Sequence, residues 1–268
     1  IAGGLIGALK KGGTDEFGVF TPNELGELHY ENLSLQIPER YRQFGEVWHL
    51  QVANDMLYVQ TRYYIFICKA DGEIEVLDPG SIIYNSLFWE GDLYVATARD
   101  LYVYTGNRLH VLRDAELLRG TVVCSLLPYG NEGMIIATDF HGLYLYDGKS
   151  IRPFTTDADS YISTNQLYTL AINDYQIAFG TVLGGVVLTN LQGQNAKYLT
   201  RTDGLQNNTV LSLLFDAQGN LWMGLDKGID VMNSSNPVLL YRDEQIDYGS
   251  GYSCIEHAGM LYMGTNQG

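Results

Sequence analysis

The sequence predicts an all-β protein, a β-propeller whose blades are four-stranded antiparallel sheets. Three observations support this prediction. An apolar strand recurs at nearly constant intervals, another strand precedes each copy across a tight turn, and two further strands of rising polarity follow it. Four strands in about 40–45 residues is the period of one propeller blade. A β-sandwich would not repeat its strands at this interval in this order.

The most regular element is the second strand of each blade, which is a short apolar run. Its copies begin 36, 41, 43, 44 and 40 residues apart. The six copies start at Leu57, Leu93, Met134, Ile177, Leu221 and Leu261. A degenerate copy is expected to end at 13–15, ahead of a third strand at 17–20.

The other strands are placed relative to the second one. First strands precede it across turns rich in Asn, Asp and Gly, which suit tight turns. They are expected at 47–52, 83–88, 123–127, 167–172, 210–215 and 252–255. Third strands are expected at 64–67, 101–104, 143–146, 186–188 and 229–232. The more polar fourth strands, expected at the outer and half-solvated edge, fall at 73–77, 108–112, 150–154, 196–200 and 238–242.

These strands divide a single domain, residues 1–268, into successive blades. The expected blades are 1–46, 47–80, 81–120, 121–163, 164–208, 209–250 and a partial one at 251–268. Seven blades are predicted, with six blades closed by strands from both ends as the alternative. Because the pattern starts and stops inside a blade, the chain is expected to be a piece of a longer protein. Short helical turns are expected after Pro38 and at 114–119.

The clearest copy of the unit lies at 203–229. Its first strand, 209–215, is β-branched and apolar, which predicts burial on both faces. In the turn that follows, Gly219 tolerates positive φ, and Asp216 and Asn220 can bond their own backbone. Gly224 is expected to leave room for a neighbouring sheet.

Composition and charge exclude several classes of partner. The net charge of −15, with no basic cluster, argues against binding to nucleic acid or to an anionic membrane surface. No run of 18 apolar residues occurs, so no membrane insertion by this domain is expected. Cys68, Cys124 and Cys254 lie in predicted strands and are expected to be buried free thiols.

The sequence carries no catalytic or metal-binding motif. There is no nucleophile elbow or phosphate loop, and the five histidines have no metal-ligand spacing. We therefore predict no catalytic residue, no metal site and no cofactor. A pair of catalytic carboxylates, as in a glycosidase, is left open by the sequence, because such a pair needs proximity in space rather than in sequence.

One face of the predicted propeller is a candidate ligand-binding surface. The turns between second and third strands lie on the same face as the links between blades, and here they combine Arg, Asp, His, Asn and aromatic residues. Such a ring suits a sugar or a peptide through Arg contacts and aromatic stacking. The simpler interpretation is a set of ordinary polar turns. The candidate residues are Arg62, Arg99, Asp139, His141, Asp226, Lys227 and Asn266.

The stretch Asp-Gly-Leu-Gln-Asn-Asn-Thr-Val-Leu-Ser-Leu-Leu-Phe-Asp-Ala-Gln-Gly-Asn-Leu-Trp-Met-Gly at 203–224 closely resembles the two-component regulator propeller repeat. The resemblance extends over 203–232, is weaker at 81–104, 121–146 and 164–188, and is poor before residue 47. Residues 14–77 resemble the subgroup in which the propeller precedes a triple-tyrosine domain. In the family, this repeat forms the extracytoplasmic sensor part of Bacteroidetes regulators.

The resemblance implies a function as well as a fold. It implies a periplasmic sensor, the extracytoplasmic part of an inner-membrane regulator, that detects an oligosaccharide or another small ligand. A full-length protein would carry a histidine kinase or a helix-turn-helix domain and would act as a homodimer, while this fragment would not be an enzyme. The family motif is structural, so it transfers no site residue. The alternatives are a propeller enzyme, either lyase or glycosidase, and a scaffold for protein contacts.

Overall fold

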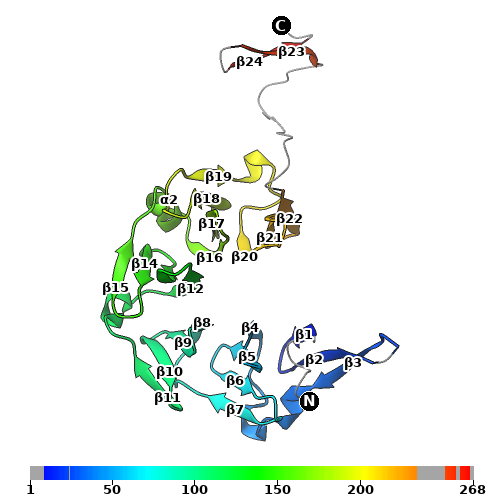
Figure 1. Ribbon diagram of the computed structural model, residues 1–268, viewed down its shortest axis with the longest axis vertical. Coiled ribbons are helices and arrows are strands. Elements are labelled where there is room, and N and C mark those ends of the chain that lie inside the picture. Colours follow the sequence, from blue (N-terminus) through cyan, green and yellow to red (C-terminus); the bar gives the residue numbers. More distant parts are fainter. Residues whose placement is uncertain (1–8, 24, 234–250, 258–259, 266–268) are drawn as a thin grey trace.

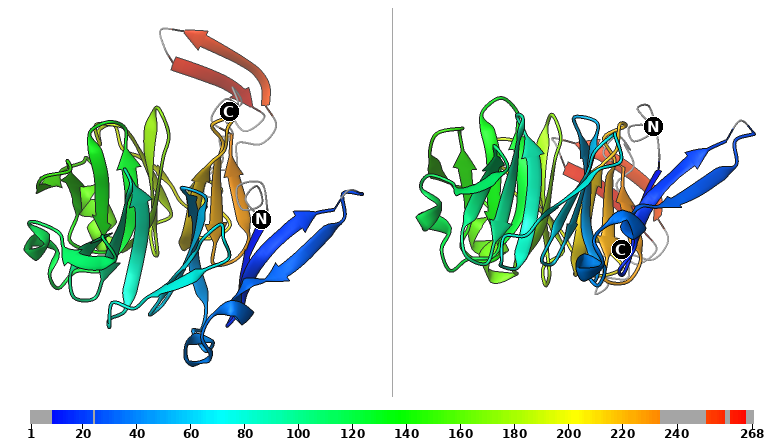
Figure 2. Two further views of the ribbon diagram at one scale, coloured as in Figure 1. Left: turned by 60° about the horizontal axis from the view of Figure 1, so that its bottom comes forward. Right: turned by 90° about the horizontal axis from the view of Figure 1, so that it is seen from below.

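The computed structural model describes residues 9–23, 25–233, 251–257 and 260–265. It is a β-propeller whose antiparallel blades stand side by side in an open arc around a common centre (Figure 1). Side views show the blades as upright sheets that follow one another along the arc (Figure 2). The prediction of an all-β propeller is confirmed.

Four blades have four strands each, paired in sequence order. Blade one consists of β4 (Val47–Ala53), β5 (Met56–Thr61), β6 (Ile65–Cys68) and β7 (Ile74–Leu77). Blade two consists of β8 (Ile83–Trp89), β9 (Asp92–Thr97), β10 (Leu101–Thr105) and β11 (Arg108–Val111). Blade three consists of β12 (Val123–Tyr129), β13 (Gly133–Thr138), β14 (Leu143–Tyr146) and β15 (Ile151–Phe154). Blade four consists of β16 (Leu167–Ile172), β17 (Gln176–Thr181), β18 (Val186–Asn190) and β19 (Lys197–Leu199).

Blade five has three described strands: β20 (Val210–Phe215), β21 (Leu221–Leu225) and β22 (Ile229–Met232). The described residues thus form five blades, fewer than the seven predicted and the six given as the alternative. Two smaller sheets account for the difference, because neither is a complete blade. One is β1 (Leu9–Gly12), β2 (Phe17–Pro22) and β3 (Leu28–Asn32), and the other is β23 (Gly251–His257) and β24 (Met260–Thr265). The fourth strand predicted at 238–242 lies outside the described residues.

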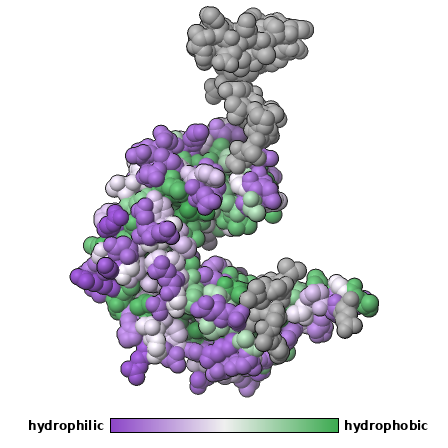
Figure 3. Space-filling model, viewed as in Figure 1, coloured by the Kyte–Doolittle hydropathy of each residue, from purple (hydrophilic) through white to green (hydrophobic). Residues whose placement is uncertain are grey.

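Burial falls from the centre of each blade to its rim. In blades one to four the second strands are almost wholly buried, and the last five residues of β5, β9 and β17 are all buried. The outermost strands β11 and β19 are largely exposed, as their alternating sequences predict. Figure 3 shows the same gradient, with hydrophilic residues along the outer rim of the arc.

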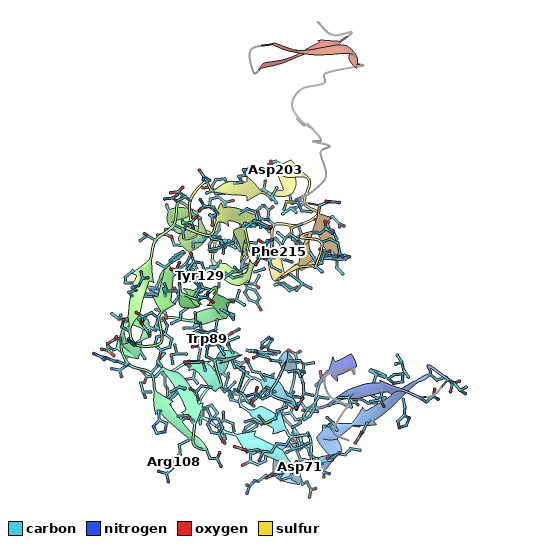
Figure 4. The ribbon with its side chains drawn as sticks, in the orientation of Figure 1. Asp71, Trp89, Arg108, Tyr129, Asp203 and Phe215 are labelled. Atoms are coloured by element: carbon cyan, nitrogen blue, oxygen red, sulfur yellow. The ribbon has the colours of Figure 1, made fainter. Side chains whose placement is uncertain are left out.

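The core lies between neighbouring blades, not inside any one of them. Between blades two and three, Tyr94 and Leu101 pack with Leu126 and Met134, and all four are at most 6% exposed. Figure 4 shows Trp89, which packs against this cluster, in the same interblade space. Because blades one to four each bury one face against the preceding sheet and the other against the following blade, the period in sequence becomes a period in packing.

Side-chain amides also join the innermost strands of adjacent blades. The Gln51 amide bridges to the backbone of Phe88, accepting from its N–H at 2.7 Å and donating to its carbonyl at 3.0 Å. Asn85 accepts from the Leu126 N–H at 3.1 Å, between blades two and three. These bonds fix the blades relative to one another near the centre of the arc.

A threonine closes the turn after the second strand in each of the first four blades. Each hydroxyl donates to the carbonyl of the residue that precedes the third strand, at 2.7–3.0 Å. All four side chains are at most 5% exposed, so the bond is shielded from water. The four residues are Thr61, Thr97, Thr138 and Thr181.

Blade five departs from the predicted burial. The prediction that 209–215 is buried on both faces is wrong, because Leu211 and Leu214 are 43% and 63% exposed. The opposite side of the strand does pack, with Val210 fully buried against blade four. The contacts that the prediction assigned to Gly224 also differ, since a Cβ there would meet Ser212 of its own blade. No described segment covers this face of blade five.

Helical segments are short and connect strands. The turn expected after Pro38 is the 3-10 helix η2 (Glu39–Tyr41), and the one at 114–119 is η3 (Ala115–Leu118). The helix α2 (Asp159–Thr164), between blades three and four, was not predicted. Two further 3-10 turns are η1 (Leu33–Gln36) and η4 (Arg201–Asp203). Among the helices of the described chain, none has the length and apolarity needed to span a membrane.

Candidate functional site

The face that carries the turns between second and third strands is called here the link-side face, because the connections between blades also lie on it. Backbone hydrogen bonds tie the turns of blades one and three to the start of the next blade. The Ile83 N–H donates to the Arg62 carbonyl at 2.8 Å, and the Leu167 N–H donates to the Asp139 carbonyl at 2.9 Å. These two turns are therefore held against the neighbouring blade rather than as independent loops.

The structure places six of the seven predicted site residues on this face. Asp139 is half-buried and the other five are exposed. Asn266 lies outside the described residues. Exposure does not distinguish a ligand-binding surface from a set of ordinary polar turns. The contacts that these residues make with one another are therefore more informative.

Two of the predicted residues lie close together. His141 Nδ1 is 4.0 Å from Asp139 Oδ1. The same carboxylate oxygen accepts the Phe140 N–H at 3.0 Å, so Asp139 is fixed by its own turn. Arg62, Arg99, Asp226 and Lys227 make no ion pair within the described part of the chain.

Sequence reasoning missed a repeated feature of the innermost strands. Each first strand contains a β-bulge at the same place, near its start. A bulge leaves one residue outside the ladder and re-aims its side chain, and bulges cluster near functional sites. The residues left outside the ladder are Trp48, Tyr84, Cys124, Tyr168, Leu211 and Tyr252. Aligning the six first strands would have shown four aromatic residues at this position.

Several of the bulge residues are unusually exposed for their size. Trp48 and Tyr168 are each 46% exposed, and Leu211 is 43% exposed. The adjoining turns add Tyr63, Phe140 and Leu183, at 46%, 46% and 64%. Exposed apolar groups gathered on one face of a protein mark an interaction surface more often than scattered ones do.

Arg62 connects two of these aromatic side chains. Its guanidinium carbon lies 5.9 Å from the centre of the Trp48 ring and 5.8 Å from the centre of the Tyr63 ring. These distances are within the range of cation–π contact. The three side chains are all exposed, so they present a cation flanked by flat apolar surfaces to solvent.

The opposite face carries a pocket that none of the predicted residues lines. It has a volume of about 480 Å³ and lies between blades three and four. Its wall includes Tyr129, whose hydroxyl donates to the Leu191 carbonyl at 2.5 Å across the blade boundary. Figure 4 shows Tyr129 between these blades. Glu132 and Asp174 give the rim an acidic character.

Perturbed carboxyl groups lie away from the link-side face. Hydrogen bonds from the Ser150 and Lys149 backbone lower the pKa of Asp147, and bonds led by the Trp222 indole lower the pKa of Asp216. Both residues belong to turns of the opposite face. On the innermost strand of blade one, burial lowers the pKa of His49 and a backbone hydrogen bond with Ser86 opposes that change. No cluster that could hold a metal ion occurs among the residues that the structure describes.

Comparisons with known proteins agree with this architecture. Residues 204–227 match the family described as two component regulator propeller. The chain is 32% identical over 101 residues to histidine kinase P4 of Formosa agariphila, and the match covers 35% of this chain and 7% of that protein. The chain thus spans a small part of this curated relative.

Solved structures show the same fold at low sequence identity. The extracellular domain of BT4673, a proposed hybrid two-component system of B. thetaiotaomicron, is 20% identical with a TM-score of 0.64. That match covers 96% of this chain and 36% of the solved one. The WD40 propeller domain of Doa1 matches with a TM-score of 0.61 at 13% identity, over 86% of this chain and 76% of that one. Such likenesses establish the fold, and the sequence match at 204–227 adds the repeat type: the chain is a β-propeller that carries the two-component regulator propeller repeat.

Proposed function

We propose that this propeller is the extracytoplasmic sensor domain of a membrane-bound two-component regulator and that it binds a carbohydrate-derived ligand on its link-side face. The observation that carries the proposal is the regulator propeller repeat at 204–227 within an array of blades of the same design. The similar proteins named as a histidine kinase and as the extracellular domain of a two-component system support the same role. We place the domain in the periplasm for the same reason.

The link-side face supports binding more than catalysis. It offers exposed aromatic rings beside basic groups that form no ion pair with the described residues, and such surfaces hold polar ring-shaped ligands. A lyase or glycosidase needs a carboxyl group whose pKa is adjusted for proton transfer. The carboxyl groups with lowered pKa, Asp147 and Asp216, lie in turns of the opposite face, and the hydrogen bonds that lower them are those of structural turns. We therefore propose that the domain is not itself an enzyme.

The exposed apolar face of blade five bears on the scaffold alternative. Ile229 is 66% exposed, whereas the residues at the same register position in blades one to four are at most 3% exposed. Trp222 is 44% exposed where its counterparts are at most 6% exposed. These counterparts all face the following blade, so we propose that this face receives a neighbouring blade, within a ring of seven, rather than a foreign protein. The hairpin β23–β24, which repeats the first-strand bulge, would begin that blade.

Signalling requires two states whose populations the ligand changes. Because the blades are fixed to one another by buried cores and interblade hydrogen bonds, we propose that the propeller moves as a unit. The signal would then pass by rotation at its outer contacts, in a homodimer formed through the full-length protein.

A thermal-shift screen of the intact extracytoplasmic region against oligosaccharides tests the proposal. Binding of one glycan class to the folded state would raise the melting temperature by several degrees, because a ligand that binds only the folded form stabilises it. The absence of any shift across plant, microbial and host glycans would contradict carbohydrate sensing and favour the scaffold alternative.

A further inference from the structure

The link-side face is not uniform, and its chemistry is most distinctive where blade one meets blade two. Trp48, Arg62 and Tyr63 come from blade one, and Tyr84 is the bulge residue of blade two. The backbone bond from Ile83 to Arg62 places the start of β8 beside the turn that carries Arg62 and Tyr63. The four residues Trp48, Arg62, Tyr63 and Tyr84 are named the aromatic–arginine corner.

Arg62 is the unusual member of this corner. The protein carries a net charge of −15, yet no carboxylate of the described residues lies within ion-pairing distance of this guanidinium. Asp100, in the corresponding turn of blade two, pairs with Arg119 at 3.1 Å. An exposed arginine without an anionic partner on an acidic protein keeps its full hydrogen-bonding capacity for a ligand.

The aromatic residues of the corner restrict what such a ligand can be. Trp48 and Tyr63 are both 46% exposed and lie beside the guanidinium, so they offer flat apolar surfaces next to a charged fork of donors. Free phosphate or a carboxylate alone would use the fork and leave the rings bare. A ring-shaped ligand with one apolar face and one anionic substituent would use both.

We infer that the aromatic–arginine corner binds an acidic sugar, with the sugar ring on Trp48 or Tyr63 and its carboxylate or sulfate group on Arg62. The inference rests on the proposed carbohydrate-sensing function and specifies the site and the ligand class. The other predicted residues of the link-side face lack this combination, because neither Arg99 nor Lys227 lies over an aromatic ring of the described residues and Asp139 lies beside His141. Neutral sugars would meet the rings but would leave the arginine without an anionic partner.

The three tryptophans of the chain allow a direct test in the full chain. Labelling with 5-fluorotryptophan gives one fluorine NMR signal each for Trp48, Trp89 and Trp222, assigned by Trp→Phe variants. Trp89 packs between blades, and Trp222 is 44% exposed on blade five, so both serve as internal controls. The probes are methyl glucuronide, methyl glucoside and methyl glucoside 6-sulfate.

We expect saturable movement of the Trp48 signal with an anionic sugar, at about tenfold lower concentration than with methyl glucoside, as a charge-assisted contact to arginine predicts. The glucuronide and the sulfate arms show which anion the corner prefers. Arg62→Gln should abolish the preference for the anion, whereas Arg108→Gln, on the outermost strand of blade two, should retain it.

Three results would overturn the inference. They are a Trp48 signal that does not move with either anionic sugar, movement of Trp222 in parallel with Trp48, and an unchanged preference in the Arg62→Gln variant. Glycan stabilisation in the thermal-shift screen with a silent Trp48 would reject this corner while leaving carbohydrate sensing intact.

Discussion

The carboxylate of Asp216 organises the turn between β20 and β21. It accepts the Trp222 indole N–H at 2.8 Å, the Asn220 side-chain amide at 2.9 Å, and the backbone N–H groups of Gln218 and Asn220 at 2.9 and 2.8 Å. These bonds favour the ionised form and hold the pKa of Asp216 below its ordinary value, with the indole contributing most. The turn that the sequence attributes to Asp216, Gly219 and Asn220 forms as predicted.

This network predicts a pH dependence of stability. Because the pKa is lower in the folded state, the contribution is complete above the unfolded value of about 4 and disappears as the pH falls through the folded value. The melting temperature of Asp216→Asn should therefore fall less steeply below pH 4 than that of the native chain. Trp222→Phe, which removes the leading donor, should also flatten the curve. Superimposable profiles for all three proteins would contradict the prediction.

Two cysteines are chemically silent in the fold. Cys68 is 3% exposed and Cys124 is half-buried, and both are free. Burial raises the pKa of each thiol to about 12, so the reactive thiolate is scarce at neutral pH. The prediction of free thiols is confirmed for both residues and that of burial for Cys68, whereas Cys124 is only partly buried. The side chain of Cys254 lies outside the described part.

Thiol labelling should follow unfolding in this protein. In a Cys254→Ser background, we expect no native-state reaction of Cys68 or Cys124 with a disulfide reagent at pH 8 and complete reaction of both in urea. Rapid labelling before denaturation would show that the blades open more readily than the packing indicates. Free cysteine in the same buffer provides the control for reagent activity.

At the scale of the element, blades differ in whether a neighbouring blade covers each of their two faces. In blades one to four, the residues facing the next blade are buried or partly buried at the same register positions, whereas blade five leaves Leu214, Trp222, Ile229 and Val231 exposed by 44–66%. In repeat proteins, the next repeat normally covers such a surface. We therefore propose that the exposed surface of blade five is an interblade surface rather than a solvated edge.

A charged substitution on this surface tests whether a further blade covers it or whether it faces solvent. If the following blade covers Ile229, then Ile229→Lys should lower the free energy of unfolding by about 1–3 kcal/mol, because the ammonium group must either be desolvated or hold the two blades apart. Tyr175→Lys is the matched control, since Tyr175 is 80% exposed on a turn. Equal stability of both variants in urea titrations would show that nothing packs on Ile229.

At the scale of the whole molecule, stability is distributed along the arc. Each hydrophobic cluster of the described residues joins one sheet to the next. None of these clusters contains residues of both blade one and blade four. The described residues therefore behave as a linear array, in which a local defect weakens its neighbours first. Gly180 is a suitable place for such a defect, because a Cβ there would lie 2.8 Å from Val210 Cγ1 of blade five and 2.7 Å from Thr169 Cγ2.

Gly180→Ala should show this propagation. The added methyl group overpacks the boundary between blades four and five and should cost about 1–3 kcal/mol. Hydrogen exchange should then quicken in β16–β22 and stay at native rates in β4–β11. Val210→Ala in the same chain should restore part of the protection by making room. A uniform decrease of protection in all blades would show that the array unfolds as one unit.

Much of the fold could be predicted from the sequence because the residues of one blade lie close together along the chain. The second strands, the tight turns and the polar fourth strands all follow from residues within about 40–45 positions of one another. The sequence did not show α2 or the bulges, since a bulge exists only in the register between two strands. The blade count could not be read either, because a strand pattern does not say whether neighbouring sheets close a ring.

The sequence alone therefore determined the repeat, the strand order within a blade and the identity of the turns, because these depend on alternation and on turn chemistry along the chain. Only the tertiary structure showed which side chains and which blade faces lie against one another. It placed Arg62, in the turn after β5, beside the ring of Trp48 on β4, and it left one face of blade five uncovered. Those relations arise where separate segments meet, and the residues of a single segment do not encode them.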